Sequence, residues 1–388
     1  MAFTIEDALD QTGDLYKIKL VAGKNNCGNN INWVHMIEDM TIIQQLWGKE
    51  LSVTTGLGFQ THDSLMKLVQ RLVKYHSVGL IINTGKYIFD IPEDIIAYCD
   101  EQGLPLMTVP WEVALADLIK DYSMRCLLSE REDRQISRYF KKAFLNPREI
   151  EEARHNLIEN FDVDGQFQVL LIYVEDVELM GPIERRRLTS QLEICFEKVE
   201  SPYSSFWYDE YFVMIINNIE EDVLEDLVNN MYKRTKRRIE DHKIYIGIGT
   251  MMKDFRNIYL VYKRAYAAVR MAKQFLYPVI FFEEMGVYQI LFSIEDDQIL
   301  LEMYHRMLDP LIDYDQKHNG ELQETLYQYL LFDGNQQAMS KKLYMHRNTI
   351  NYRLSKIKSL TGSDLSSFEE KLPYMIAFYI QKMLPERI

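Results

Sequence analysis

A short stretch near the carboxyl end of the sequence concentrates side chains that suit contact with nucleic acid. Residues 336–362 carry six basic residues and no acidic residue, although the chain of 388 residues has a formal net charge of −14. Arginine can donate two hydrogen bonds to guanine, asparagine can pair with adenine, and lysine and hydroxyl groups can contact phosphates. A local basic region in an acidic protein predicts a DNA-contacting element.

Two short helices joined by a tight turn are expected to hold these side chains. The first covers residues 336–344, the turn is Met345-His346, and the second helix covers residues 347–360. Ile350, Leu354 and Ile357 recur at helical spacing in the second helix, so they should face a core. The polar residues between them should therefore face outward, as in a helix that enters a major groove.

The polar face of the second helix supplies the candidate DNA contacts. Base contacts are expected from Arg347, Asn348, Asn351 and Tyr352. Phosphate contacts are expected from Lys341, Lys342, Thr349, Arg353, Lys356 and Lys358. Two alternatives stay open. Arg353 could form a salt bridge within the domain, and the helices could be a solvated charged hairpin, although such helices usually mix charges of both signs.

The same stretch resembles a known family. The run His346-Arg347-Asn348-Thr349-Ile350, followed by Tyr352-Arg353-Leu354 and by Leu360-Thr361-Gly362, is similar to the carboxy-terminal helix-turn-helix of the purine-catabolism-regulator (PucR/CdaR) transcription factors. The resemblance implies a double-stranded DNA operator as partner. We expect a homodimer or higher homo-oligomer that places two copies of residues 347–360 in successive major grooves, about 34–36 Å apart.

Composition limits the class of protein. A chain of 388 residues suggests two or three domains, and 47% hydrophobic with 26% charged residues is typical of a globular protein. The four cysteines are scattered without a CxxC pair, so a disulfide framework or a zinc site is not expected. The first residues do not resemble a signal peptide, and no apolar run approaches the roughly 20 residues of a membrane span. We expect a cytoplasmic protein without membrane contact.

The amino-terminal third alternates strand and helix patterns. Residues 51–55, 78–83 and 104–109 read as buried strands and 65–75 and 92–101 as helices, which predicts a parallel α/β sheet. Ligands bind such sheets at the carboxyl ends of the strands. Candidate ligand-binding residues follow two of these strands: Thr54, Thr55, Gly56, Asn83 and Lys86. Ordinary turn chemistry is the open alternative, and neither loop has the pattern of a phosphate loop.

This third also resembles the amino-terminal domain of the PucR family. The resemblance runs through Val21-Ala22-Gly23, residues 31–35, Thr54-Thr55-Gly56 and residues 105–110. It implies a sensor of a small-molecule effector that the sequence does not identify. His35 could contact that ligand or satisfy a backbone carbonyl, whereas Trp33 is expected to pack in the core.

The central third follows a strand, helix, strand, strand, helix, strand order. This order resembles a ferredoxin-like palm, and more closely the GGDEF-like domain in the middle of PucR/CdaR regulators. Active diguanylate cyclases carry two glycines at the hairpin where this chain has Trp207-Tyr208-Asp209-Glu210-Tyr211. The large aromatic residues would fill the space that bare glycine backbone leaves for a nucleotide. We therefore expect no enzymatic activity and no cofactor or metal, with a nucleotide-binding protein or enzyme as the alternative.

The whole sequence therefore predicts a multidomain α/β plus α protein. A parallel α/β sensor is expected over 1–123, a helical connector over 124–164 and a degenerate GGDEF-like α+β domain over 165–285. A second helical connector is expected over 286–318 and an all-α helix-turn-helix domain over 319–388. The predicted function is a metabolite-controlled transcription regulator of catabolic genes.

Overall fold

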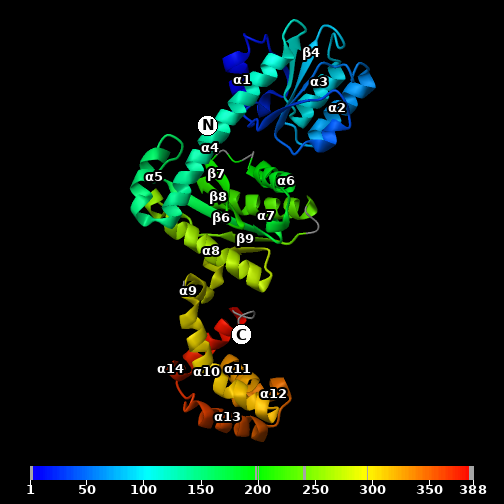
Figure 1. Cartoon of the computed structure of the whole chain (residues 1–388). Helices are drawn as coiled ribbons and strands as arrows, with labels where there is room; N and C mark the ends of the chain where they lie inside the picture. Colours follow the sequence, from blue (N-terminus) through cyan, green and yellow to red (C-terminus); the bar gives the residue numbers. More distant parts are fainter. Residues whose placement is uncertain (1–2, 197–198, 200, 239–241, 295, 384–388) are drawn as a thin grey trace. The chain divides into compact units, whose positions relative to one another are not determined.

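Two compact units make up the chain, Met1–Val269 and Arg270–Ile388, and the division between them falls inside one helix (Figure 1). The computed structural model describes residues 3–196, 199, 201–238, 242–294 and 296–383. Within the described residues, we find no helix that combines the length and the apolar character needed to cross a bilayer.

The first domain of the first unit is a five-stranded sheet in the order β1-β5-β4-β3-β2. Strands β2 to β5 are parallel, and β1 is antiparallel to β5. Its strands are β1 (Lys19–Ala22), β2 (Trp33–Met36), β3 (Glu50–Thr54), β4 (Gly79–Thr84) and β5 (Leu106–Pro110). Its helices are α1 (Ile5–Thr12), α2 (His62–Lys74) and α3 (Glu93–Gln102). The parallel sheet expected from the sequence is therefore present, with two additional strands, β1 and β2.

Apolar side chains cover both faces of this sheet. One core lies between the sheet and helices α2 and α3, and the other between the sheet, α1 and the first half of helix α4 (Leu115–Leu145). The central strands β3 and β4 are buried except at the half-buried Thr84, which fits the apolar residues 80–82 of β4 and Leu51 and Val53 of β3. Trp33 differs from expectation. It is 43% exposed, because β2 is the edge strand of the sheet.

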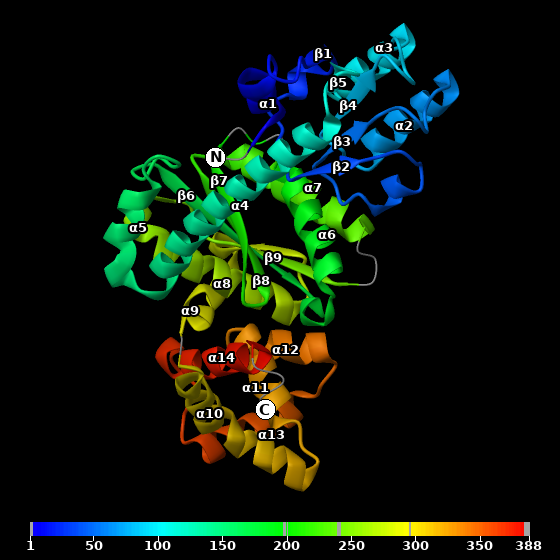
Figure 2. The ribbon, with the colours of Figure 1, turned by 45° about the horizontal axis from the view of Figure 1, so that its top comes forward.

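Helix α4 is 31 residues long and connects the two domains of the first unit (Figure 2). Its first half buries Leu118 and Tyr122 against the first domain. Its second half buries Phe140 and Phe144, and the Phe144 ring stacks on Tyr262 of the central domain at 4.3 Å. Within the predicted connector, residues 124–164, the second half of α4 thus packs on the central domain.

The central domain has an antiparallel sheet in the order β9-β6-β8-β7, with the short strand β10 beside β6. The strands are β6 (Gln166–Val174), β7 (Tyr203–Tyr208), β8 (Tyr211–Asn217), β9 (Ile244–Ile248) and β10 (Met252–Lys253). The helices are α5 (Ile150–Leu157), α6 (Pro182–Glu193), α7 (Glu221–Arg238) and α8 (Ile258–Phe275). Gly247 allows α8 to lie directly on β9, since an added Cβ atom would stand 2.1 Å from the Val269 amide nitrogen.

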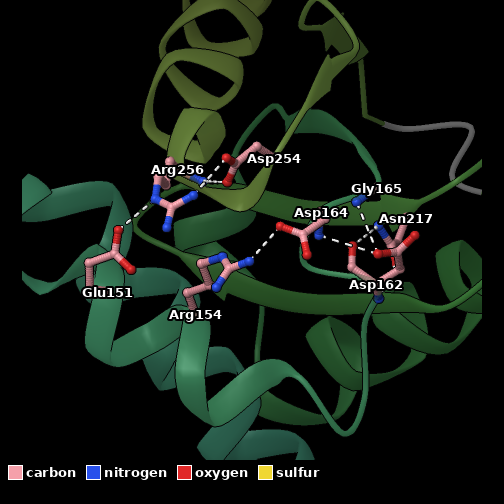
Figure 3. A network of polar contacts seen from close by, with 8 residues as sticks. All are labelled: Glu151, Arg154, Asp162, Asp164, Gly165, Asn217, Asp254 and Arg256. Carbon is pink, nitrogen blue, oxygen red and sulfur yellow. Dashed lines mark hydrogen bonds and ion pairs between the residues drawn. The ribbon is translucent and has the colours of Figure 1, made fainter.

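Ion pairs hold α5 to the central domain (Figure 3). Arg256 bridges Glu151 of α5 and Asp254, at 2.6 Å and 2.9 Å. Arg154 of α5 pairs with Asp164 in the loop before β6. The same loop is closed by Asp162, which accepts hydrogen bonds from the backbone of Asp164 and Gly165. These contacts fix the end of the α4–α5 segment on the sheet.

The second unit is mainly helical. It contains β11 (Val279–Phe281), α9 (Tyr288–Ser293), α10 (Asp297–His318), α11 (Leu322–Leu331), α12 (Gln336–Leu343), α13 (Arg347–Thr361) and α14 (Phe368–Met383). Helix α10 packs against α11, α13 and α14 and buries Tyr304, Leu308 and Leu311. The stretch 286–318 was expected to be a connector, but α10 is one of the helices of this unit.

Candidate DNA interface

Local hydrogen bonds define the turn between α12 and α13. Asn335 caps α12, since its side-chain oxygen accepts the Ala338 amide at 3.0 Å. Ser340 donates its hydroxyl to the Met345 carbonyl at 2.7 Å, and His346 Nδ1 accepts the Asn348 amide at 3.2 Å. The two helices and their turn lie where the sequence predicted them, and the start of α13 is fixed by its own cap.

The apolar stripe of α13 faces the core of the unit. Ile350 and Ile357 are fully buried, and Leu354 is nearly so. Met339 of α12 is also fully buried, and α13 packs against α10, α11 and α12. The helical periodicity read from the sequence is confirmed, and it determines which side of α13 is turned to solvent.

The opposite side of α13 is polar and exposed. The exposed candidates are Arg347, Asn348, Thr349, Asn351 and Tyr352 on α13 and Lys341 and Lys342 on α12. All of the base-contact candidates lie within the first two turns of α13. This arrangement can offer hydrogen-bond donors and acceptors to the edges of bases and positive charge to phosphates.

Three candidates have contacts inside the unit. Arg353 Nη1 lies 2.8 Å from Glu321 and 3.3 Å from the Thr325 hydroxyl, so its guanidinium takes part in the salt bridge left open as an alternative. The Lys356 ammonium lies 5.1 Å from the centre of the Tyr314 ring. Lys358 lies near Glu370, whose pKa is lowered first by the Ser366 amide and also by Lys358.

Two tyrosines of this region were not among the predicted contacts. Tyr344, at the end of α12, is 96% exposed and adopts the left-handed conformation with φ of 53°. Bulky residues rarely adopt the left-handed conformation. The sequence could have singled out Tyr344 only if the end of α12 had been known. Tyr314 belongs to α10, and its ring centre lies 5.1 Å from the Lys356 ammonium of α13. No sequence signal links Tyr314 to α13, because Tyr314 lies on another helix, far from α13 in the sequence.

The candidate effector region lies at the carboxyl edge of the first sheet. Strands β3 and β4 are neighbours, so the loops that carry Thr54–Gly56 and Asn83–Lys86 are adjacent, as expected. His35 is half-buried on β2 beside Ser52, and burial holds its pKa below the usual value. The Lys86 ammonium lies 4.7 Å from the centre of the Trp111 ring.

Most polar groups of these two loops have partners within the domain. The Thr54 hydroxyl accepts the Gly56 amide at 3.0 Å, and the Asn83 side chain donates to the Pro110 carbonyl at 3.0 Å. Gly56 has φ of 82°, and an added Cβ atom would stand 2.6 Å from the Ile88 side chain. These contacts favour the turn-chemistry alternative for Thr54, Gly56 and Asn83.

Two further features of the same edge were missed from the sequence. A cavity of about 270 Å³ lies between residues 59–65 and residues 87–92, lined by the rings of Phe59, Tyr87 and Phe89 and by polar groups that include His62 and Asp90. In the loop after β2, Glu38 Oε1 accepts the Thr55 amide at 2.6 Å. Its buried Oε2 makes no hydrogen bond to any residue that the structure describes.

Two segments of the chain match known family profiles. Residues 8–124 match the purine catabolism regulatory protein-like (PucR) family, and residues 322–380 match the PucR carboxy-terminal helix-turn-helix domain. Both ends of the chain are therefore similar to the PucR family. The match at 322–380 contains α11 to α13 and most of α14, and therefore all of the exposed candidates on α12 and α13.

Several curated relatives are regulators. The DNA-binding transcriptional activator AdeR of Bacillus subtilis is 25% identical over 227 residues, which cover 56% of this chain and 52% of AdeR. The purine catabolism regulatory protein of the same organism is 28% identical over 47% of this chain and 35% of its own length. The proline-responsive transcriptional activator PutR is 30% identical over 36% of this chain and 34% of its own. The chain thus spans about half or less of the length of these relatives.

A regulator of polyketide synthase expression from Bifidobacterium adolescentis is among the solved structures that match. It is 16% identical and covers 61% of this chain and 92% of its own, with a TM-score of 0.27. The three curated relatives are named as a regulatory protein and two transcriptional activators.

Between the two PucR matches, aromatic side chains fill the space around the β7–β8 hairpin. The Trp207 indole donates to the Thr189 hydroxyl at 2.7 Å, and the Arg185 guanidinium lies 4.3 Å from its ring. Tyr208 packs edge-on against Tyr262 at 6.1 Å. Trp207 and Tyr208, at the end of β7, are thus packed against α6 and α8.

Proposed function

We propose that this protein is a sequence-specific DNA-binding transcription regulator in which α13 enters the major groove. The single observation that supports this most is the exposed face of α13, which gathers Arg347, Asn348 and Asn351 in a segment without acidic residues. Arg347 and the two asparagines would read base edges, with Tyr352 beside them. Lys341, Lys342 and Thr349 would hold phosphates and set the register of the helix on the duplex.

The regulator would act in the cytoplasm as a homodimer or higher homo-oligomer. A dimer with two-fold symmetry places two copies of α13 about one helical turn of DNA apart, and the operator is then a palindrome with matching half-sites. The central domain would mediate contact between copies of the protein and would couple the sensor domain to the DNA-binding domain. Its β9-β6-β8-β7 strand order supports the interpretation as a ferredoxin-like, degenerate GGDEF-like domain.

The first domain would sense the effector that controls catabolic genes. We place the effector in the cavity between residues 59–65 and 87–92, because its aromatic residues together with polar ones such as His62 and Asp90 suit a small polar metabolite. A thermal-shift screen of the wild type against a library of common metabolites tests this. A hit should lose its shift in Phe89→Ala, whose ring is 70% exposed, and keep it in Leu179→Ala, which alters an exposed leucine elsewhere. An unchanged shift in both variants would place the effector in another site.

Selection of bound duplexes from a random library tests the DNA function. The wild type should enrich one motif at physiological salt. Arg347→Ala should lose roughly 1–3 kcal/mol of binding free energy and relax the motif at one position.

Arg306→Ala is the matched control, because Arg306 is an exposed arginine of the same unit on α10. It should select the motif of the wild type. If the wild type enriches no motif, with or without a metabolite that shifts its thermal stability, the regulator proposal fails. If Arg347→Ala weakens matched and random duplexes equally, Arg347 contacts phosphate and not a base.

A further inference from the structure

A large aromatic residue stands at the junction of α12 and α13. Tyr344 follows the last residue of α12, and its backbone adopts the left-handed conformation, with φ of 53° and ψ of 35°. Bulky residues avoid this conformation, because their Cβ atom then crowds the backbone. The helix ends at Asn319, after α10, and at Gly362, after α13, are also left-handed and carry residue types that tolerate it. The backbone at the end of α12 therefore does not by itself favour a tyrosine.

The Tyr344 side chain contributes little to the stability of its own unit. The residue is 96% exposed, so it buries almost no apolar surface against the neighbouring helices. A tyrosine ring stabilises a folded domain mainly by being buried. The left-handed tyrosine thus costs free energy in its backbone and regains little through packing. Strained residues of this kind cluster at binding sites, where the contact with a ligand offsets the strain.

Hydrogen bonds around Tyr344 hold its backbone in place. Its own amide donates to the Ser340 carbonyl, and the Met345 amide donates to the same carbonyl at 3.2 Å. The Ser340 hydroxyl donates to the Met345 carbonyl at 2.7 Å. His346 then caps α13 by accepting the Asn348 amide at 3.2 Å. The ring therefore extends from a fixed point of the junction, which lowers the cost of ordering it when a ligand binds.

The chain on both sides of Tyr344 is basic and suits a polyanion. Lys341 and Lys342 lie in the last turn of α12, Arg347 begins α13, and residues 334–363 contain no acidic residue. In docked helix-turn-helix domains, the second helix contacts base edges with its first residues, and the first helix crosses the DNA backbone. The junction between the two helices therefore lies beside phosphates. The tyrosine hydroxyl is one of the groups that donate hydrogen bonds to phosphate oxygens.

We propose that Tyr344 contacts the DNA backbone, and that its hydroxyl donates a hydrogen bond to a phosphate oxygen beside the groove that α13 enters. This inference rests on the proposed function of α13 and adds an uncharged contact at the junction of α12 and α13. A phenol hydroxyl is uncharged at neutral pH, so it displaces no counterion and its contribution should not depend on salt. The contribution should not depend on base sequence either, because phosphate contacts carry no sequence information.

Two variants of the full-length protein test the contact. Tyr344→Phe removes the hydroxyl alone, and Tyr344→Asn removes the ring and installs a residue that tolerates the left-handed backbone. Affinity is measured over a range of salt concentrations, on the duplex that the wild type selects from a random library and on a scrambled duplex. Tyr344→Phe should bind both duplexes about tenfold more weakly, the value of one hydrogen bond to a charged group. Tyr344→Asn should bind at least as weakly, although its melting temperature should not fall below that of the wild type.

Salt dependence and two matched controls separate this contact from other effects. Lys342→Ala should lower the slope of log K against log salt by about 0.9, whereas both Tyr344 variants should keep the slope of the wild type. Tyr277→Phe removes the hydroxyl of an exposed tyrosine elsewhere in the same unit and should keep the affinity. Asn319→Gly alters another left-handed helix end of the unit and should also keep it.

Three results would overturn the inference. If both variants bind as tightly as the wild type, the hydroxyl makes no contact. If Tyr344→Phe loses affinity for the selected duplex alone, the hydroxyl meets a base edge, and if its melting temperature falls together with its affinity, the role of the hydroxyl is structural. Failure of the inference also differs from failure of the proposed function. A wild type that selects no motif removes both, whereas a wild type that selects a motif and binds it no better than the two variants do removes the inference alone.

Discussion

Substitution of Arg353 distinguishes a structural arginine from a DNA-contacting one. The sequence placed Arg353 among the phosphate contacts, and the structure pairs its guanidinium with Glu321 at 2.8 Å and with the Thr325 hydroxyl at 3.3 Å. If these contacts are its role, Arg353→Ala should loosen α13 without removing a phosphate contact. Lys342, an exposed residue of α12, should show the opposite behaviour.

The size of the effect follows from the burial of the pair. The Arg353 side chain is 21% exposed and the Glu321 side chain 63% exposed. The pair therefore lies between surface ion pairs, worth about 0–1 kcal/mol, and buried ones, whose disruption costs about 3–5 kcal/mol. With the additional hydrogen bond to Thr325, Arg353→Ala should lower the free energy of opening of α13 by about 1–2 kcal/mol.

Two assays on the full-length protein measure the two roles. Hydrogen exchange of α13 peptides, followed by mass spectrometry, reports the free energy of local opening. The dependence of DNA affinity on salt reports phosphate contacts, since each contact adds about 0.9 to the slope of log K against log salt. Arg353→Ala should speed exchange and keep the slope. Lys342→Ala should keep the exchange rates and lower the slope by about 0.9.

Glu321→Ala provides a check from the other partner. It should speed the exchange of α13 in the same direction as Arg353→Ala, and the double variant should be less affected than the sum of the two. The reasoning is refuted if Arg353→Ala leaves exchange unchanged and lowers the salt slope as Lys342→Ala does. Arg353 would then contact a phosphate in the complex and give up its salt bridge on binding.

Three further predictions concern stability. Burial lowers the pKa of His35, so at acidic pH the unfolded chain binds more protons than the folded protein does. Calorimetry should therefore find the first domain less stable at about pH 5.5 than at about pH 7.5. His35→Gln should weaken this dependence of stability on pH. Gly247→Ala should cost about 1–3 kcal/mol or more in denaturant unfolding, because the new methyl would meet the α8 backbone, whereas Gly181→Ala, with open space, should cost little. Asp315→Ala should lower the opening free energy of α11, measured by hydrogen exchange, by about 1–2 kcal/mol.

The central strands of the first sheet could be predicted from the sequence because buried strands are rich in apolar residues. Strand β4 carries the apolar run of residues 80–82, and β3 carries Leu51 and Val53, as is typical of strands that are buried in a sheet. The edge strands β1 and β2 lack that signal, since each is only four residues long and partly exposed. Trp33 was expected in the core for the same reason, because nothing in the sequence indicated that β2 would lie at the edge.

The exposed face of α13 could be predicted because helical periodicity is local. Ile350, Leu354 and Ile357 fix the buried side within one helix, and the polar side follows from them. The partner of Arg353 could not be predicted, since Glu321 belongs to the segment before another helix. The loops after β3 and β4 raise the same difficulty, because glycine, threonine and asparagine suit both a turn and a ligand site.

Contacts between helices also determine which residues the DNA-binding domain must include. A domain that began at residue 319 would have the whole helix-turn-helix but would lack Asp315, which holds the start of α11, and Tyr314, whose ring lies 5.1 Å from the Lys356 ammonium. It would also lack the α10 residues Tyr304, Leu308 and Leu311, which are buried within this unit. Helix α10 therefore completes the core behind the buried stripe of α13.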